Sequence, residues 1–253
     1  MNLSKTAFDC RLTVLDMVYK AKTGHIGGSF SCMDILVSLY YRHLKQEDRF
    51  ILSKGHCAEA LYAVLADRGI LQKEQLKTFA AFDTALAEHP TRKVPGVDFA
   101  TGALGHGLSV GVGMAIGLKN SNVYVLMGDG ELAEGSVWEA AMAAAKYRLG
   151  NLIAIIDRNQ LQISGTTEDV MPLDDLGEKF RAFGWDVRHC DGHNPDEISL
   201  QTSQKSLVVI ANTVKGYGST LMEGNAEWHH QIPTDEQYQL IKAELIRRRD
   251  EHA

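Results

Sequence analysis

Three short, uninterrupted apolar segments constrain the fold of this chain more than any other feature. They cover residues 123–127, 152–156 and 207–211, and a fourth, weaker segment covers 185–189. A strand that is apolar at every position is buried on both faces, which is typical of parallel sheets. Helical stretches separate these segments, so we predict an α/β fold with a doubly wound, mainly parallel sheet and helices on both faces.

The remaining chain supplies the helices and loops of this fold. We predict helices at residues 6–19, 33–41, 58–67, 108–118, 137–147 and 235–249. The glycines at 24, 27 and 28 predict a break after the first helix, and the segment 89–107 is rich in proline and glycine and predicts a loop. Because no repeat or linker separates these elements, we predict one domain over residues 1–253.

Composition limits the classes of partner. The chain has 253 residues and a formal net charge of −6, without a long basic block. This charge argues against nucleic acid or an anionic membrane as the main partner. Four scattered cysteines, no apolar stretch of membrane-spanning length and no signal-peptide pattern at the first residues predict a reducing, cytoplasmic location.

The strongest chemical signal lies where two predicted strands end. Gly128-Asp129-Gly130 follows the first apolar segment, and Asp157-Arg158-Asn159-Gln160 closes the second. Ligands of doubly wound sheets bind outside the carboxyl ends of the strands, where both groups lie. The oxygens of Asp129 and Asn159 are of the kind that Mg²⁺ prefers, and Gly130 permits a close approach to phosphate. A lone Gly-Asp-Gly is more often a simple turn, so the rest of the chain decides.

Several separated motifs, in a fixed order, make the chain resemble the N-terminal, diphosphate-binding domain of transketolases. The motifs are Thr23–Gly28, Leu52–His56, His89-Pro90 with Pro95–Val97, Thr101–Gly107, Gly128–Gly135 followed by the strand that ends in Asn159-Gln160, Lys215–Gly218 and His229–Pro233. The resemblance covers the chain from the first predicted helix to about residue 233. It implies that the chain binds thiamine diphosphate and Mg²⁺ and takes part in transferring a two-carbon ketol unit between a ketose and an aldose, as phosphates.

The resemblance also implies roles for individual residues. Metal ligands would be Asp129, Asn159 and the carbonyl of Leu161; cofactor contacts would come from His56, Gly130, Asn159 and His230 on the diphosphate side, and from Gly102, Ala103 and Leu104 at the aminopyrimidine. Substrate-facing catalytic residues would be His25, His89 and His230, with help from His56, and Glu134 would join a carboxylate network at a subunit interface, supported by Glu139.

Histidines suit this chemistry because imidazole can accept or donate a proton near neutral pH. Other histidines have plainer interpretations: we expect His189 and His193 to be structural or surface residues, and His43 and His252 to be solvated. His106 stands where transketolases often have glutamine, so its role stays open. His229 is adjacent to His230, so the assignment between these two also stays open.

The resemblance ends before the domains that would supply the activating glutamate and most of the sugar-phosphate site. We therefore expect a separate C-terminal subunit carrying the pyrimidine-binding and C-terminal domains, with two copies of each chain in the assembly. The alternatives are a subunit of another thiamine diphosphate enzyme, such as a 1-deoxyxylulose-phosphate synthase-like enzyme, and a non-catalytic regulatory or binding subunit. A 2-oxo-acid dehydrogenase alpha subunit fits the motifs around His25, His56 and His89 poorly.

Overall fold

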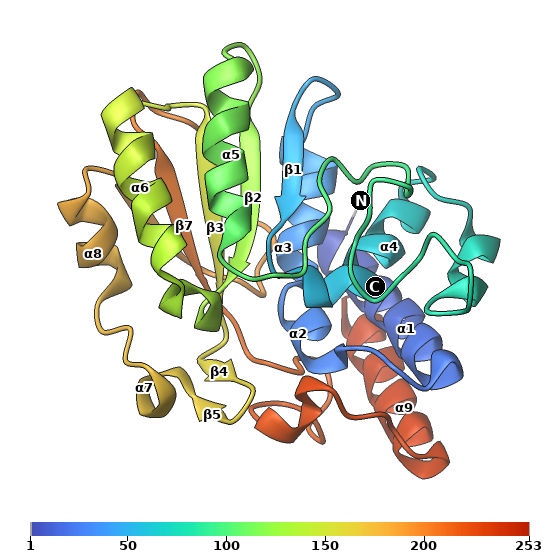
Figure 1. Ribbon diagram of the computed structural model, residues 1–253. Coiled ribbons are helices and arrows are strands. Elements are labelled where there is room, and N and C mark those ends of the chain that lie inside the picture. The colour runs from blue at the N-terminus through green and yellow to red at the C-terminus, as the bar shows by residue number, and fades with distance from the viewer. Residues whose placement is uncertain (1, 253) are drawn as a thin grey trace.

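The computed structural model describes residues 2–252 and contains a five-stranded sheet in the order β1-β2-β3-β7-β6, with all neighbouring strands parallel (Figure 1). The strands are β1 (Arg49–Leu52), β2 (Val123–Gly128), β3 (Leu152–Arg158), β6 (Asp186–Asp191) and β7 (Leu207–Asn212). A two-stranded antiparallel ribbon, β4 (Leu161–Gln162) with β5 (Gly165–Thr166), follows β3. The predicted parallel α/β sheet is confirmed.

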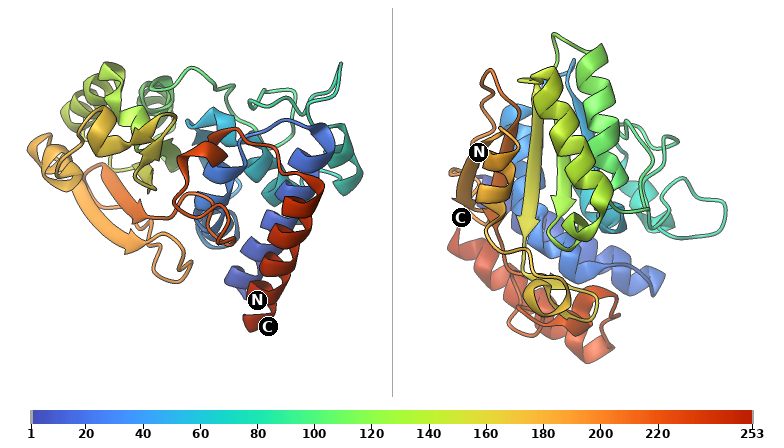
Figure 2. Two further views of the ribbon diagram at one scale, coloured as in Figure 1. Left: turned by 90° about the horizontal axis from the view of Figure 1, so that it is seen from below. Right: turned by 60° about the vertical axis from the view of Figure 1, so that its left-hand side comes forward.

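Side chains of the strands alternate between two hydrophobic cores, one on each face of the sheet. In β2, Leu126 belongs to one core and Val125 to the other, both fully buried. The first core is covered by α1 (Leu3–Ala21), α3 (Met33–Ser38), α4 (Ala58–Asp67) and α9 (Asp235–Glu251). The second is covered by α5 (His106–Gly117), α6 (Gly135–Tyr147) and α8 (Leu176–Ala182), as Figures 1 and 2 show. Burial on both faces explains why these strands are apolar at every position.

Short elements complete the chain and carry much of the site. They are α2 (Ile26–Ser31), α7 (Thr167–Val170), a π-helical turn η1 (Leu39–His43), and the 3₁₀ turns η2 (Gly55–Cys57), η3 (Lys73–Thr78), η4 (Gly130–Ala133) and η5 (Ala226–His229). None of the described helices is both long and apolar enough to cross a membrane.

Two local predictions were wrong. The glycine segment was expected to be a loop, but Gly27 and Gly28 lie inside α2. A Cβ atom on Gly27 would lie 2.5 Å from the carbonyl oxygen of Trp228, so glycine is needed there for close packing rather than for a turn. His43 was expected to be solvated, but it is half-buried and one ring nitrogen lies 3.0 Å from the carbonyl oxygen of Ile198.

Candidate functional site

The site lies at the carboxyl edge of the sheet, because β1, β2, β3 and β7 all end there. The segments that leave these strands are 53–56, 128–130, 158–161 and 213–216. Each of them carries at least one residue of the motifs described above. The parallel sheet therefore brings together groups that are far apart in the sequence.

Asp157, at the end of β3, is the hub of this edge. Its carboxylate is fully buried and accepts hydrogen bonds from Ser31 Oγ (2.6 Å), Asn159 Nδ2 (3.3 Å), Thr213 Oγ1 and Lys54 Nζ. Burial alone would lower the pKa of Lys54, but the opposing carboxylate of Asp157 outweighs it and holds that pKa well above its ordinary value. The hub thus ties α2 and the ends of β1 and β7 to the end of β3.

Asp129 begins the predicted metal-binding set and is 1% exposed. Its Oδ1 accepts from the backbone N–H of Gly130 (2.8 Å), and its Oδ2 accepts from the N–H of Gln160 (2.6 Å) and from Arg158 Nη1 (3.1 Å). Burial, followed by the charge of Asp157, raises the pKa of Asp129 above its ordinary value. A bound cation would favour the ionised carboxylate and offset that cost.

The orientation of Asn159 follows from the hub. Its Nδ2 donates to Asp157 and to Ser31 Oγ (3.2 Å), so its Oδ1 is directed away from the hub, where it accepts from the N–H of Leu161 (3.1 Å). Asp129 and Asn159 therefore offer oxygens at two adjoining strand ends, and Leu161 lies next to them in β4. A set of carboxylate, amide and carbonyl oxygens has the chemistry that suits Mg²⁺.

Glu131 fixes the loop that contains Gly102, Ala103 and Leu104. It is 2% exposed, and its Oε1 accepts from the N–H of Gly105 (2.8 Å) while its Oε2 accepts from the N–H of Gly128 (3.2 Å). It also accepts from Ser53 Oγ. The predicted aminopyrimidine-binding loop is thereby held against the ends of β1 and β2.

Five histidines gather beside this edge from four segments of the chain. The ring centroid of His25 lies 5.5 Å from that of His56, 6.0 Å from His89, 5.4 Å from His229 and 4.7 Å from His230. The rings of His56 and His229 are 5.5 Å apart. The structure therefore brings all four predicted histidines together and adds His229, and His25 is at the centre of this histidine cluster.

Burial makes much of the histidine cluster uncharged at neutral pH. It lowers the pKa of His25 to about 4 and that of His229 to about 3, and neighbouring cationic groups add to both effects. The pKa of His89 is also lowered, mainly by burial. Lys215, whose Nζ lies 3.1 Å from His229 Nδ1, has a pKa lowered to about 8, first by burial and then by Lys54.

Two glutamates beside the cluster were missed by the sequence analysis. Glu59 is fully buried in α4, and its Oε1 accepts from the backbone N–H of His25 (2.6 Å). Burial raises the pKa of Glu59 to about 8. Glu88 Oε2 lies 3.6 Å from His230 Nε2. No sequence pattern marks Glu59, whereas the position of Glu88 directly before the His89-Pro90 motif could have drawn attention to it.

Glu134, Glu139 and His106 are all exposed, and their side chains make no hydrogen bond or ion pair with any residue that the structure describes. Their predicted or open roles need groups from outside this chain, so they stay predictions. His193, by contrast, is structural as expected: its Nδ1 lies 3.0 Å from Asp34 Oδ2 and its ring stacks on Tyr217, with centroids 3.6 Å apart.

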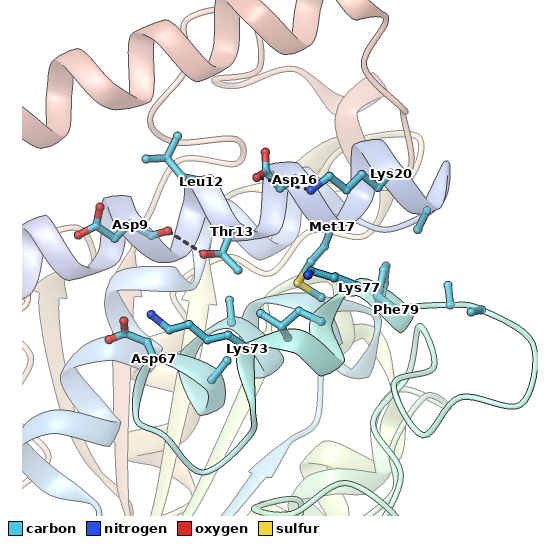
Figure 3. Close-up of a pocket in the computed structure, with 16 residues that line it drawn as sticks. Asp9, Leu12, Thr13, Asp16, Met17, Lys20, Asp67, Lys73, Lys77 and Phe79 are labelled. Carbon is cyan, nitrogen blue, oxygen red and sulfur yellow. Dashed lines mark hydrogen bonds and ion pairs between the residues drawn. The ribbon is translucent and has the colours of Figure 1, made fainter.

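A separate groove of about 730 Å³ lies between α1, α4 and η3 (Figure 3). Asp9, Asp16 and Lys73 are among its polar residues, and Met17 and Phe79 are among its apolar ones. It contains none of the predicted site residues, so the carboxyl edge of the sheet remains the candidate site.

This fold and edge define a cofactor-binding domain of the α/β class, and comparison with known proteins identifies its family. Residues 4–246 match the family described as "Transketolase, thiamine diphosphate binding domain". One of the two subunits of the apulose-4-phosphate transketolase of Phocaeicola vulgatus is 48% identical, with 94% of this chain and 92% of the relative covered. A 6-deoxy-6-sulfo-D-fructose transketolase subunit of Clostridium sp. is 40% identical, with 97% and 96% covered.

The fold agrees with solved transketolases. The enzyme of Campylobacter jejuni superimposes with a TM-score of 0.86 at 30% identity, covering 97% of this chain. The chain spans only 45% of the length of that enzyme, but nearly the full length of the relatives named as subunits. The chain belongs to the transketolase family, as its thiamine diphosphate-binding domain.

Proposed function

We propose that this chain is the N-terminal subunit of a two-subunit transketolase. With thiamine diphosphate and Mg²⁺, it would transfer a two-carbon ketol unit between ketose and aldose phosphates, together with a C-terminal subunit, as two copies of each chain in the cytoplasm. The observation that carries this proposal is the convergence of the Asp129–Asn159 oxygens and the histidine cluster at one edge of the sheet. Full-length relatives named as transketolase subunits support the division between two chains.

The residues at the strand ends would hold the cofactor. Asp129, Asn159 and the carbonyl of Leu161 would bind the metal, and Gly130 and His56 would contact the diphosphate. The loop of Gly102, Ala103 and Leu104 would line the aminopyrimidine. Bound there, thiamine diphosphate supplies a nucleophilic carbon and an electron sink.

The histidines would bind the substrate and move its protons. Because the pKa of His25 is about 4, its ring is a neutral acceptor at physiological pH, suited to receive a hydroxyl proton rather than to deliver one. His89 would act from another side of the same ring. Their partial burial also excludes water from the reacting groups.

The two adjacent histidines would have different roles. His229 lies close to His56 and Lys215, on the inner side of the cluster. His230 is exposed and lies near Glu88, on the outer side. We therefore assign the cofactor-side role predicted for His230 to His229, and we keep His230 as a substrate contact. Glu134 would join the carboxylate network with the partner subunit.

The rival functions make different use of the same residues. A 1-deoxyxylulose-phosphate synthase-like enzyme would share the metal and diphosphate contacts but would use pyruvate as donor. A non-catalytic subunit would have no need of five clustered histidines, three of them with a pKa lowered by burial. The cluster therefore favours catalysis of sugar chemistry.

Reconstitution tests the proposal. Ketol transfer is assayed with this chain alone, with a polypeptide carrying the two complementary transketolase domains alone, and with both mixed, in Mg²⁺ and thiamine diphosphate. We expect turnover only in the mixture, because the activating glutamate must come from the second chain. Robust turnover by the purified chain alone would refute the two-subunit proposal, and turnover with pyruvate as donor would favour the synthase.

A further inference from the structure

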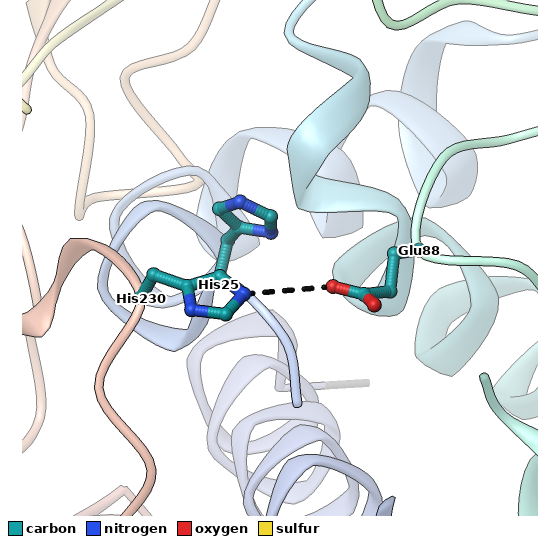
Figure 4. A group of neighbouring side chains, drawn as sticks. All are labelled: His25, Glu88 and His230. Carbon is teal, nitrogen blue, oxygen red and sulfur yellow. Dashed lines mark ion pairs between the residues drawn. The ribbon is translucent and has the colours of Figure 1, made fainter. Parts of the chain in front are cut away.

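The outer side of the histidine cluster holds a set of ligands that the proposed function does not require. One side-chain ligand atom from each of His25, Glu88 and His230 lies within 4.8 Å of the other two (Figure 4). Two imidazole nitrogens and one carboxylate oxygen form a set that binds Zn²⁺ in proteins, with water as the fourth ligand. Mg²⁺, in contrast, prefers oxygen ligands throughout.

We propose that His25, Glu88 and His230 bind a divalent transition-metal cation of the zinc type, at a site different from the Asp129 metal site. The distances need only a small adjustment. Ligands of a tetrahedral zinc ion lie about 3.3 Å from one another. Glu88 Oε2 and His230 Nε2 are already 3.6 Å apart. An approach of about 1 Å by these two side chains towards His25 completes the set.

The three residues differ in mobility in a way that allows this approach. The His25 backbone is fixed by its hydrogen bond to the buried Glu59. The side chains of His230 and Glu88 are 52% and 31% exposed, and Glu88 lies in an irregular segment between η3 and α5. His25 Nδ1 is buried and has no hydrogen-bond partner among the described residues. A fixed ligand and two adjustable ones can close around a cation, and solvent can reach the fourth position.

Charge places the cation on the outer side of the cluster rather than the inner side. His229, on the inner side, has the Lys215 ammonium 3.1 Å from its ring nitrogen, and this positive charge would repel a metal ion. Glu88 supplies the anionic ligand on the outer side, next to His230. If the substrate roles proposed for His25 and His230 are correct, the cation would occupy their ring nitrogens and compete with the sugar.

Calorimetric titration of the full chain with zinc chloride tests the site. We expect one zinc ion per chain, and binding at least about tenfold weaker in Glu88→Gln and in His230→Gln, because each loses one of three protein ligands. The matched control is His189→Gln, an exposed histidine on β6 whose loss should leave binding unchanged. Circular dichroism confirms that each variant is folded.

Three further measurements separate this site from others. Cobalt(II) should give the intense visible absorption of a tetrahedral complex in the parent and not in Glu88→Gln. Excess Mg²⁺, or the Asp129→Ala substitution, should leave zinc binding intact; displacement of zinc by either would overturn the proposal. So would equal zinc affinity in the parent, Glu88→Gln and His230→Gln. In the reconstituted enzyme, zinc binding without inhibition would leave the metal site standing and refute only its competition with the sugar.

Discussion

Asp157 and Glu59 are both fully buried carboxyl groups, one on each side of the candidate site, and their surroundings are opposite. Asp157 accepts a hydrogen bond from the buried ammonium of Lys54 and from three further side chains. Glu59 has no cationic partner among the described residues; only the backbone N–H of His25 contacts its Oε1, and its Oε2 has no partner. The strand-end side is thus fully paired, whereas the histidine side keeps groups unpaired.

This contrast shows what each side is suited to do. Paired groups hold a fixed shape, as a metal and diphosphate site requires. Unpaired imidazoles with a lowered pKa remain free to accept a proton or a ligand. The predictions below test this division, from the largest expected effect to the smallest.

Glu59→Gln tests whether the histidine side contains a neutral carboxyl group. The folded-state pKa of Glu59 is raised from 4.5 to about 8, so its contribution to stability is fully present below pH 4.5 and is lost as pH rises through 8. The parent should lose roughly 5 kcal/mol of unfolding free energy over this window, and the glutamine variant should not. Urea unfolding across the window measures this. The exposed Glu47→Gln serves as control, and identical pH slopes in Glu59→Gln and the parent would contradict the prediction.

His25→Ala tests whether the histidine side acts on substrate rather than on cofactor. Turnover in the reconstituted enzyme should fall by a factor equivalent to roughly 2–4 kcal/mol, with cofactor affinity changed only a few-fold. Steady-state kinetics and a cofactor titration give the two values, and the exposed His189→Ala provides the baseline. A collapse of cofactor affinity would move His25 to the cofactor side of the division.

Asp129→Ala tests the strand-end side. Loss of a charged ligand should weaken the joint binding of Mg²⁺ and thiamine diphosphate about 10-fold to 100-fold or more. Calorimetry on the reconstituted complex measures the affinity, with Asp250→Ala, at the end of α9, as a remote acidic control. Unchanged affinity would exclude Asp129 from the metal site.

Gly113→Ala lies outside both sides and should have the smallest effect. A Cβ atom there meets nothing within 4 Å, so alanine should raise the unfolding free energy of the isolated chain by about 0.5–1 kcal/mol through helix propensity. Thermal unfolding monitored by circular dichroism measures this. At Gly55, in contrast, a Cβ atom would lie 2.6 Å from Thr101 Oγ1, and the same substitution should destabilise the chain. Equal effects at both positions would show that the close approach at Gly55 is not needed.

The sequence predicted the strand-end side better than the histidine side, for a physical reason. Continuous apolar strands locate their own carboxyl ends, so Asp129 and Asn159 could be placed at one edge from local patterns alone. Glu59 and Glu88 depend on contacts between segments distant in the chain, such as Glu59 with His25, which no local period reveals. The helix α2 was missed for the same reason, since its glycines answer to packing against Trp228. The roles of the individual site residues stay predictions.

The Asp157 hub also restricts how this chain can change through evolution. Removing Lys54 alone would leave a buried carboxylate without its cation, at a cost of about 3–5 kcal/mol, which is a large part of the stability of an ordinary domain. Replacing both residues with apolar ones is a much smaller perturbation, but it passes through a destabilised single substitution. We therefore expect Lys54 and Asp157 to be inherited as a unit across related chains, with Ser31 and Thr213 varying only where that unit persists.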